Sequence, residues 1–335
     1  MGITLKELAL KAGVSEATVS LALNQRPGVK AATREAIQKL ANEYGYIPSQ
    51  NAQSLALKKS GLIGMIVPNI TNSAYAGLVE HTENLLREEG YHLIVATSRS
   101  DYKYECDMIK QFISFRVEGL ILYPSIKYNP DPSYVSLLKS YNIPFVYVGG
   151  YYRQVDGPVC MNDYYKSVWL ATNALVESGC RRICLVSGDK SIVSNTLRYE
   201  GVQDALRAHR LPFSPADHIQ LENSNYAQAY TVLSALMEKP FPYDAIIAVN
   251  TLASLGIYSA AFEHGIRVPE DLSIIAGDYF LPQEACRISL SSIKFDREAL
   301  VQKAVAMLLT QMRNEPLKEK CVTIAPVFIP GDSAR

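Results

Sequence analysis

The order of apolar and polar positions divides the chain into a short helical segment and a longer region of alternating strands and helices. In the first 46 residues, apolar side chains recur at helical spacing over residues 5–12, 16–23 and 31–44. Thr4 and Glu7 have the spacing of a capping box before the first helix, and Gly13 follows its end. Two short helices joined by a tight turn that contains glycine predict a helix-turn-helix. A small helical cap on the following domain is the alternative.

From Leu62 onward, short β-branched runs alternate with amphipathic helices. Strands are predicted over 63–67, 92–96, 120–123, 145–148, 183–186, 219–221, 245–249, 272–276 and 290–293, with a last strand-like run over 322–329. Helices are predicted over 77–89, 105–114, 164–177, 198–209, 227–238, 252–264 and 297–313. This strict alternation is typical of parallel sheets with helices on both faces, and its repetition before and after about residue 160 predicts an α/β fold of two doubly wound lobes.

Open parallel sheets bind ligands beyond the carboxyl ends of their strands, so two facing lobes would enclose a cleft there. The residues that follow predicted strands are Asn69 to Tyr75, Ser98 to Asp101, Tyr123 to Ser125, Ser187 to Asp189, Asn250 with Thr251, and Asp278 with Tyr279.

Charge is distributed unevenly between these two regions. The 335 residues exceed what one hydrophobic core serves, and 33 basic residues balance 33 acidic ones. Residues 1–60 hold eight Lys and Arg against four Glu, so this end carries +4 and the remaining 275 residues carry −4. A basic head on an acidic body favours contact with nucleic acid through phosphate neutralisation.

The remaining composition argues against several other classes. The six cysteines form no CxxC pair and no cluster with histidine at metal-ligand spacing, so we expect reduced core thiols and no metal site. No apolar run reaches membrane-spanning length, and the polar N-terminal pattern differs from a signal peptide. We therefore expect a cytoplasmic protein that does not contact membranes.

The headpiece sequence resembles a known family. The runs Thr4-Leu5-Lys6-Glu7-Leu8-Ala9, Ala12-Gly13-Val14-Ser15, Ala17-Thr18-Val19-Ser20 and Leu23-Asn24, followed by Thr33-Arg34 and Gly45-Tyr46-Ile47-Pro48, closely resemble the lac repressor (LacI/GalR) family. The likeness continues across the whole chain. It implies a headpiece over 1–46, a hinge helix over 47–60, and a periplasmic-binding-protein-like domain. In that domain 61–159 with 290–321 form the N-terminal lobe, and 160–289 with 322–335 form the C-terminal lobe.

The resemblance also implies how the second helix would contact operator DNA. The base-reading positions are occupied by Glu16, Ala17 and Leu21, and the phosphate-contacting positions by Ser15, Thr18, Ser20 and Asn24. Many relatives carry Arg where this chain has Leu21, which can meet a thymine methyl but cannot donate to guanine. Lys30 stands where a serine usually caps the third helix.

The linker between the two regions matches the family's hinge. In relatives this segment folds on operator DNA, pairs with the second subunit's copy and wedges a leucine into the minor groove. The matching residues are Gln53, which replaces the commoner Arg or Lys, and Leu55. An ordinary apolar anchor is the alternative role for Leu55.

For the cleft, the resemblance implies an effector site at Ala74, Tyr75, Asn162, Arg198, Asn250 and Asp278. The guanidinium of Arg198 and the carboxylate of Asp278 suit a polyhydroxylated ligand such as a sugar. Each has a structural alternative: a surface salt bridge for Arg198 and a loop cap for Asp278. Tyr75 could stack on a sugar ring or plug the lobe. Ser73-Ala74, Thr251 and Gly277 depart from the family pattern.

Together these observations predict a transcriptional regulator, most simply a repressor, that binds a pseudopalindromic operator as a homodimer under control of a small molecule. An enzyme would need a glycine-rich phosphate loop or an activated nucleophile; neither is present, and no cofactor or catalytic residue is expected. A solute-binding protein would have an export signal and no headpiece. The helix with Leu78, Val79, Thr82, Leu85 and Leu86 is the expected dimerisation element, or alternatively lobe core. No leucine-heptad tail follows the last strand, which favours a dimer over a tetramer.

Overall fold

The computed structural model describes residues 3–46, 59–70, 73–125, 131–278 and 289–335, without the side chains of residues 73 and 74. These residues form two compact units, 1–61 and 62–335, which are considered separately. The hinge residues Gln53 and Leu55 lie outside the described ranges.

The first unit is a three-helix headpiece, and its helices have the predicted positions. Helix α1 covers Leu5–Ala12, α2 covers Glu16–Leu23 and α3 covers Ala31–Glu43. Thr4 and Glu7 complete the predicted capping box, and Gly13 ends α1 with a left-handed φ of 65°. The core is formed by Leu8, Ala9, Val19, Ala22, Ile37 and Ala41.

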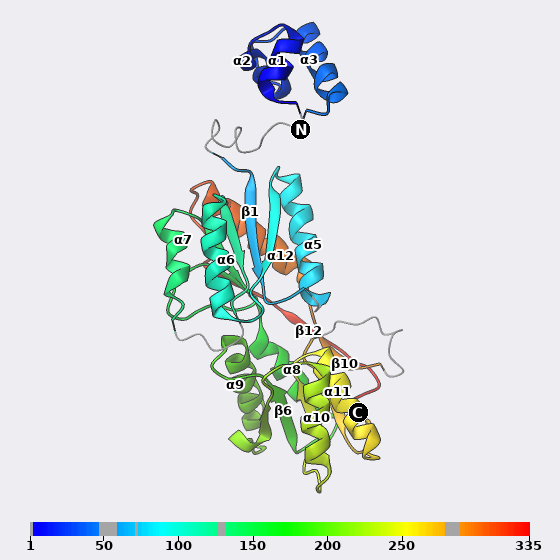
Figure 1. Cartoon of the computed structure of the whole chain (residues 1–335). Coiled ribbons are helices and arrows are strands. Elements are labelled where there is room, and N and C mark those ends of the chain that lie inside the picture. Colours follow the sequence, from blue (N-terminus) through cyan, green and yellow to red (C-terminus); the bar gives the residue numbers. More distant parts are fainter. Residues whose placement is uncertain (1–2, 47–58, 71–72, 126–130, 279–288) are drawn as a thin grey trace. The chain divides into compact units, whose positions relative to one another are not determined.

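The N-terminal lobe of the second unit is built on a six-stranded sheet with the order β11-β5-β4-β3-β1-β2, in which every pairing is parallel. Figure 1 shows β1 of this sheet between the helices of its two faces. The strands are β1 (Leu62–Val67), β2 (His92–Thr97), β3 (Gly119–Leu122), β4 (Phe145–Val148), β5 (Val159–Asn162) and β11 (Cys321–Ile324). Helices α5 (Ser73–Glu88) and α12 (Arg297–Met312) pack on one face. The other face is covered by α6 (Tyr102–Ser114) and by η1 (Ser133–Val135) with α7 (Ser136–Ser140).

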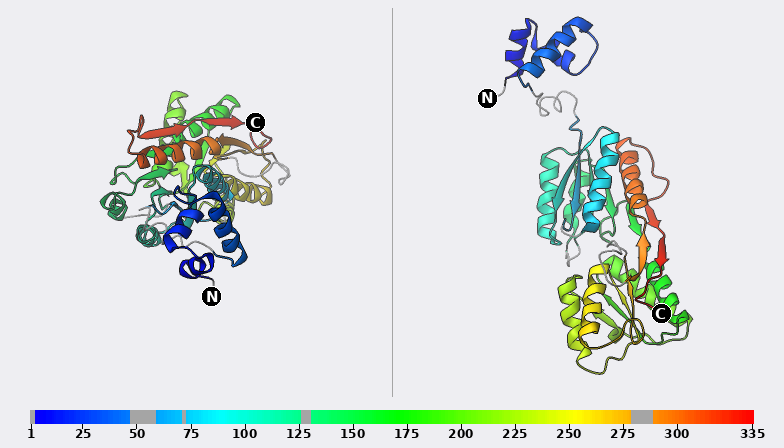
Figure 2. Two further views of the ribbon diagram at one scale, coloured as in Figure 1. Left: turned by 90° about the horizontal axis from the view of Figure 1, so that it is seen from above. Right: turned by 90° about the vertical axis from the view of Figure 1, so that its right-hand side faces the viewer.

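The C-terminal lobe repeats this plan with the strand order β12-β10-β9-β8-β6-β7. Figure 2 shows helices on both sides of the sheet in each lobe. Its strands are β6 (Ile183–Ser187), β7 (His218–Gln220), β8 (Ala245–Ala248), β9 (Ser273–Ala276), β10 (Ser291–Phe295) and β12 (Pro326–Ile329). Helices α10 (Tyr226–Met237) and α11 (Thr251–Glu263) cover one face, and α8 (Tyr164–Glu177) with α9 (Val193–Ala208) covers the other. The prediction of parallel sheets is corrected at one point, because β12 runs antiparallel to β10.

The chain passes between the lobes at three places, each a few residues later than the sequence predicted. The crossings follow β5 at Asp163, β10 at Asp296 and β11 at Ala325, where boundaries near 160, 290 and 322 were expected. An apolar strand looks the same in either sheet, so the local pattern could not assign β5, β10 and β11 to a lobe. The crossings lie together: Asp163 donates its N–H to the Ile324 carbonyl at 2.9 Å, and Phe295 pairs with Pro326.

Several further elements differ from the prediction: among them, η1 and α7 were not predicted, and α5 begins at Ser73, four residues before its predicted start at residue 77. Strand β5 was not predicted: its four residues, which follow Gly157 and Pro158, were left unassigned. The predicted run over 322–329 is two strands in different sheets. Helix α9 begins at Val193, five residues before its predicted start at Arg198, because the polar residues of its first turn hide the apolar period.

The prediction of buried cysteines is only partly correct. Cys160, Cys180 and Cys184 are buried free thiols, Cys106 is half-buried and Cys321 is exposed, while Cys286 lies outside the described residues. Within the ranges that the structure describes, no helix is both long and apolar enough to cross a membrane.

Candidate functional sites

Helix α2 presents a polar face to solvent in the headpiece. Its apolar residues Val19 and Ala22 are buried against α1 and α3, whereas Glu16 and Ala17 are exposed. The packing therefore leaves the two predicted base-reading positions at the start of α2 accessible, as a helix that enters a major groove requires.

The predicted phosphate-contacting residues also stabilise the ends of α2. Ser15 is the N-cap, its Oγ accepting the Thr18 N–H at 3.2 Å and lying 2.9 Å from the Thr18 hydroxyl. Asn24 donates its side-chain amide to the Ser20 carbonyl at 2.8 Å. Four hydroxyl and amide groups are thus held at the two ends and along one side of α2, in positions fixed by hydrogen bonds.

Both predicted departures from the family pattern have local consequences. Leu21 is half-buried and lies close to Gly28 in the loop before α3. Lys30 occupies the N-cap of α3 without forming a side-chain cap hydrogen bond. Arg34 instead ties this loop to α3 by donating to the Arg26 carbonyl at 2.8 Å.

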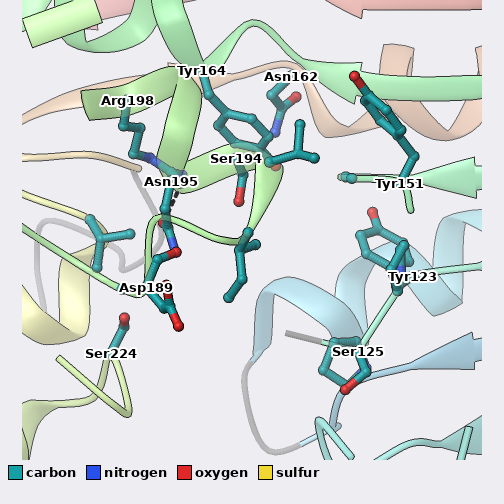
Figure 3. A pocket seen from close by; sticks show the side chains of 18 of the residues that line it. Tyr123, Ser125, Tyr151, Asn162, Tyr164, Asp189, Ser194, Asn195, Arg198 and Ser224 are labelled. Atoms are coloured by element: carbon teal, nitrogen blue, oxygen red, sulfur yellow. Dashed lines mark hydrogen bonds between the residues drawn. The ribbon is translucent and has the colours of Figure 1, made fainter. Parts of the chain in front are cut away.

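The second unit contains a cavity of about 740 Å³ at the carboxyl ends of both sheets. It is lined by residues that follow β1, β3, β6 and β8, which are the strands at the point where the order of each sheet reverses. Figure 3 shows Arg198, Asn195 and Ser224 on one side, and Tyr123 and Ser125 on the other. A cavity of this size is adequate for a small ligand.

Arg198 is a buried cation in the wall of this cavity. Only 7% of its surface is exposed, and its guanidinium lies 4.3 Å from the centre of the Tyr164 ring. Its Nη1 donates to Asn195 Oδ1 at 3.3 Å, while its Nε has no hydrogen-bond partner among the described residues. Burial lowers the pKa of Arg198 below its usual value. The surface salt bridge considered from the sequence is therefore wrong, since the side chain is directed into the lobe.

Asp278 lies on the same wall, held by Thr251. The Thr251 N–H donates to Asp278 Oδ1 at 3.1 Å, and the Thr251 hydroxyl donates to the Asp278 carbonyl at 2.7 Å. Burial raises the pKa of Asp278, and the Thr251 amide opposes this rise. Within the described ranges no salt bridge joins Arg198 to Asp278, although both line the cavity.

Asn250 lines the cavity, but its side chain is occupied by structural hydrogen bonds. Its Oδ1 caps α11 by accepting the Ala253 N–H at 2.8 Å, and its Nδ2 donates to the Ser224 carbonyl at 2.8 Å. A direct contact with a ligand would have to compete with these bonds.

The opposite wall is rich in tyrosine. Tyr75 packs edge-to-face against Tyr123 with the ring centres 5.5 Å apart; Tyr123 is buried and Tyr75 is half-buried. The Tyr123 hydroxyl, Ser125 Oγ and Asn162 Oδ1 are buried without a hydrogen-bond partner among the residues that the structure describes. With Arg198 Nε these make four buried polar atoms, all on lining residues, without a hydrogen-bond partner among the described residues.

The structure brings together five of the six predicted effector residues: Tyr75, Asn162, Arg198, Asn250 and Asp278. Ala74 lies in α5, but its side chain is not described. Of the strand-end segments, Ser98 to Asp101, which follows β2, does not line the cavity. Sequence reasoning missed Tyr151, Tyr152, Tyr164, Asn195 and Phe295, which also line it. For Tyr151 and Tyr152, the available signal was that two tyrosines occur in succession shortly after the predicted strand β4.

Comparisons with known proteins place these sites in context. Residues 4–49 match the bacterial regulatory proteins, lacI family, and residues 172–334 match a periplasmic binding protein-like domain. The ribose operon repressor of Bacillus subtilis (strain 168) is 29% identical over 334 residues, which is 99% of this chain and 98% of that protein.

Solved structures share the fold. The Lac repressor dimer bound to operator and the anti-inducer ONPF has a TM-score of 0.87 at 24% identity, covering 99% of each chain. The complex of the transcriptional regulator CelR with cellobiose has a TM-score of 0.74 at 23% identity, covering 99% of this chain and 100% of that one.

The sequence relatives are transcriptional regulators, which confirms the prediction that the chain is not an enzyme. The headpiece match, the match of the second unit and the full-length relatives agree with one another. The chain belongs to the lacI family of bacterial regulatory proteins.

Proposed function

We propose that this protein is a cytoplasmic transcriptional repressor that reads a pseudopalindromic operator as a homodimer and is controlled by a sugar or sugar derivative. The observation that carries the proposal is the headpiece, in which the start of α2 is exposed and its hydroxyl groups are ordered. Three short helices around six core residues are too little protein for an enzyme, but they are sufficient to present α2 to DNA.

In this proposal Glu16, Ala17 and Leu21 read base edges, while Ser15, Thr18, Ser20 and Asn24 contact phosphates. The exposed carboxylate of Glu16 suits a cytosine amino group, and Leu21 suits a thymine methyl. Gln53 and Leu55 would act in the minor groove, where Leu55 from each subunit would open the central base step.

The effector site is the cavity of the second unit. Arg198, Asn162 and Tyr123 line the cavity and carry buried polar atoms without a partner among the described residues, and Asp278 has a carboxylate held by Thr251. Tyrosine rings beside such groups are suited to a sugar ring, which has an apolar face and several hydroxyls. The ribose operon repressor and the CelR–cellobiose complex support this ligand class. The ligand can change operator affinity only by binding two lobe arrangements with different affinity.

The experiment is a binding assay with palindromic DNA from the gene's own promoter region at fixed salt, repeated with each sugar that raises the melting temperature. We expect a saturable shift that at least one such sugar changes, and its direction distinguishes an inducer from a corepressor. A protein that binds sugar tightly but no DNA would contradict the proposal.

The hinge is tested by Leu55→Ala, with Leu57→Ala as the matched control two residues along the same segment. We expect the first substitution to weaken specific operator binding about tenfold, with unchanged sugar binding. The second should leave both close to wild type. Equal operator affinity for Leu55→Ala and wild type would remove Leu55 from the proposed contact.

A further inference from the structure

A buried carboxylate joins four segments of the N-terminal lobe behind the cavity. Glu105 of α6 has no exposed surface. Its Oε2 accepts the Ser125 N–H at 2.6 Å, and its Oε1 accepts the hydroxyls of Tyr134 at 2.9 Å and Tyr152 at 3.0 Å. These partners come from the segment after β3, from η1 and from the loop after β4.

All three partners donate hydrogen bonds to Glu105. The titratable groups that face it are Tyr134, Tyr152 and, on β4, Tyr147, whose own pKa Glu105 helps to raise. Strands β1 and β2, which also pack on α6, contribute the apolar residues Ile66, Ile94 and Ala96 to the core there. Burial raises the pKa of Glu105 to about 7, and the hydrogen bonds from both tyrosines and Ser125 oppose this rise.

Two of the partners form part of the cavity wall. Ser125 and Tyr152 both line the cavity, and the Ser125 N–H also points to the Tyr152 hydroxyl at 2.9 Å. Figure 3 shows Ser125 on the wall opposite Arg198. Glu105 itself is not among the lining residues, so any effect that it has on a ligand must act through these neighbours.

We propose that Glu105 is a positioning residue of the effector cavity, whose ionised carboxylate fixes Ser125 and Tyr152 on the wall and whose protonation loosens them. The inference rests on the proposed effector site, to which it adds a proton-dependent control.

The reason is the donor and acceptor balance of the cluster. A protonated carboxyl must donate its hydrogen, but the Ser125 N–H cannot accept one. A tyrosine hydroxyl must therefore rotate to accept it, so that a charge-assisted hydrogen bond to the carboxylate is replaced by a weaker, neutral one from the carboxyl. The tie from α6 to η1 or to the loop after β4 then weakens. Glu105→Gln is the neutral analogue of the protonated state at every pH.

The test measures the titration of Glu105 and the flexibility of the cavity wall separately, in the full-length protein without DNA or sugar. The glutamate side-chain carboxyl carbons are labelled with 13C and followed by NMR from pH 3.5 to pH 9, with the Glu105 signal assigned by its loss in Glu105→Gln. Hydrogen exchange of peptides covering 119–125 and 149–158 reports the wall, after correction for the intrinsic pH dependence. Asp107→Asn, an exposed position on the same helix, is the matched control.

We expect Glu105 to titrate near pH 7 in the wild type. Protection of both segments against local opening, in which the hydrogen bonds to Glu105 break while its carboxyl stays buried, should then fall about tenfold on going from pH 8 to pH 6. Glu105→Gln should hold the low-pH level of protection throughout, and Asp107→Asn should follow the wild type. Tyr152→Phe should move the Glu105 titration to higher pH, because the carboxylate loses a donor.

Titration of Glu105 at its ordinary value of 4.5 would overturn the proposal. So would equal protection of the two segments in wild type and Glu105→Gln at pH 8, or an unchanged Glu105 titration in Tyr152→Phe. None of these results depends on operator or sugar binding, so failure here is distinct from failure of the proposed function.

Discussion

Thr251 fixes Asp278 from two directions. Its hydroxyl lies 2.7 Å from the Asp278 carbonyl oxygen and 3.3 Å from Oδ1, and its N–H donates to the same Oδ1 at 3.1 Å. Thr251 is the first residue of α11, and Asp278 follows β9, so the contact joins the segments after two neighbouring strands.

Thr251→Val should therefore disturb the cavity wall. The substitution keeps the shape of the side chain but leaves the Asp278 carbonyl without its donor, which we expect to lower the free energy of unfolding by about 1–3 kcal/mol. Affinity for the sugar found in the screen should fall as well. Urea denaturation and calorimetric titration measure the two effects. Thr251→Ser retains the hydroxyl and should remain close to wild type, and a loss of similar size in both variants would contradict this explanation.

Arg198→Met should separate stability from binding. Arg198 has a desolvated guanidinium, and its Nε has no partner among the described residues. Its replacement removes the cost of burying this charge, and it also removes the favourable contact with the Tyr164 ring. We expect the free energy of unfolding of the unliganded protein to change by less than about 1 kcal/mol, while sugar affinity falls about tenfold. Arg207→Met, exposed on the same helix, should change neither quantity. A strong destabilisation without loss of binding would show that Arg198 has a structural role.

Leu21→Arg should change the operator preference. A leucine side chain can contact a thymine methyl, whereas arginine can donate two hydrogen bonds to guanine, a difference of about 1–3 kcal/mol at one base pair. Competition between operators that differ at single positions would detect a new preference for guanine at one position in each half-site. An unchanged preference would mean that Leu21 does not reach the bases.

The free energy of unfolding should also report Glu105 through its pH dependence. Its pKa is raised in the folded protein, from 4.5 to about 7, so the folded state binds the proton more tightly than the unfolded state. The contribution of Glu105 to the free energy of unfolding is therefore most favourable below pH 4.5, and it is lost as the pH rises to about 7.

The stability of Glu105→Gln relative to wild type should consequently increase with pH over that interval, by roughly 3 kcal/mol, and stay constant above it. Urea denaturation of both proteins at intervals of half a pH unit measures this difference. A difference that does not vary with pH would mean that Glu105 titrates alike in both states.

The sequence predicted the parts of this protein that depend on local pattern. The caps at Thr4 and Ser15 and the apolar spacing of α1 to α3 are local, and the helices have the predicted bounds to within one residue. The cavity was predicted at strand ends, because the strand–helix alternation fixes which segments meet there.

Other features depend on contacts between distant segments, and the sequence could not indicate them. The carboxylate of Glu105 meets Tyr152 across 47 positions, and Asn250 meets Ser224 across 26. Nothing near Glu105 in the sequence distinguishes it from an exposed helical glutamate. Similarly, the lobe to which β5 belongs is decided by its pairing with β4 and β11.

The last crossing between the lobes restricts how the effector cavity can open. Ala325 alone separates β11 of one sheet from β12 of the other, and a single residue spans at most about 3.6 Å. Pro326 further limits Ala325 to extended backbone. The two sheets therefore cannot move apart at this point, and a relative motion of the lobes must be a rotation with its axis close to Ala325. The opening at any part of the cavity then grows with its distance from this pivot, so a ligand far from the axis experiences the largest displacement for a given angle.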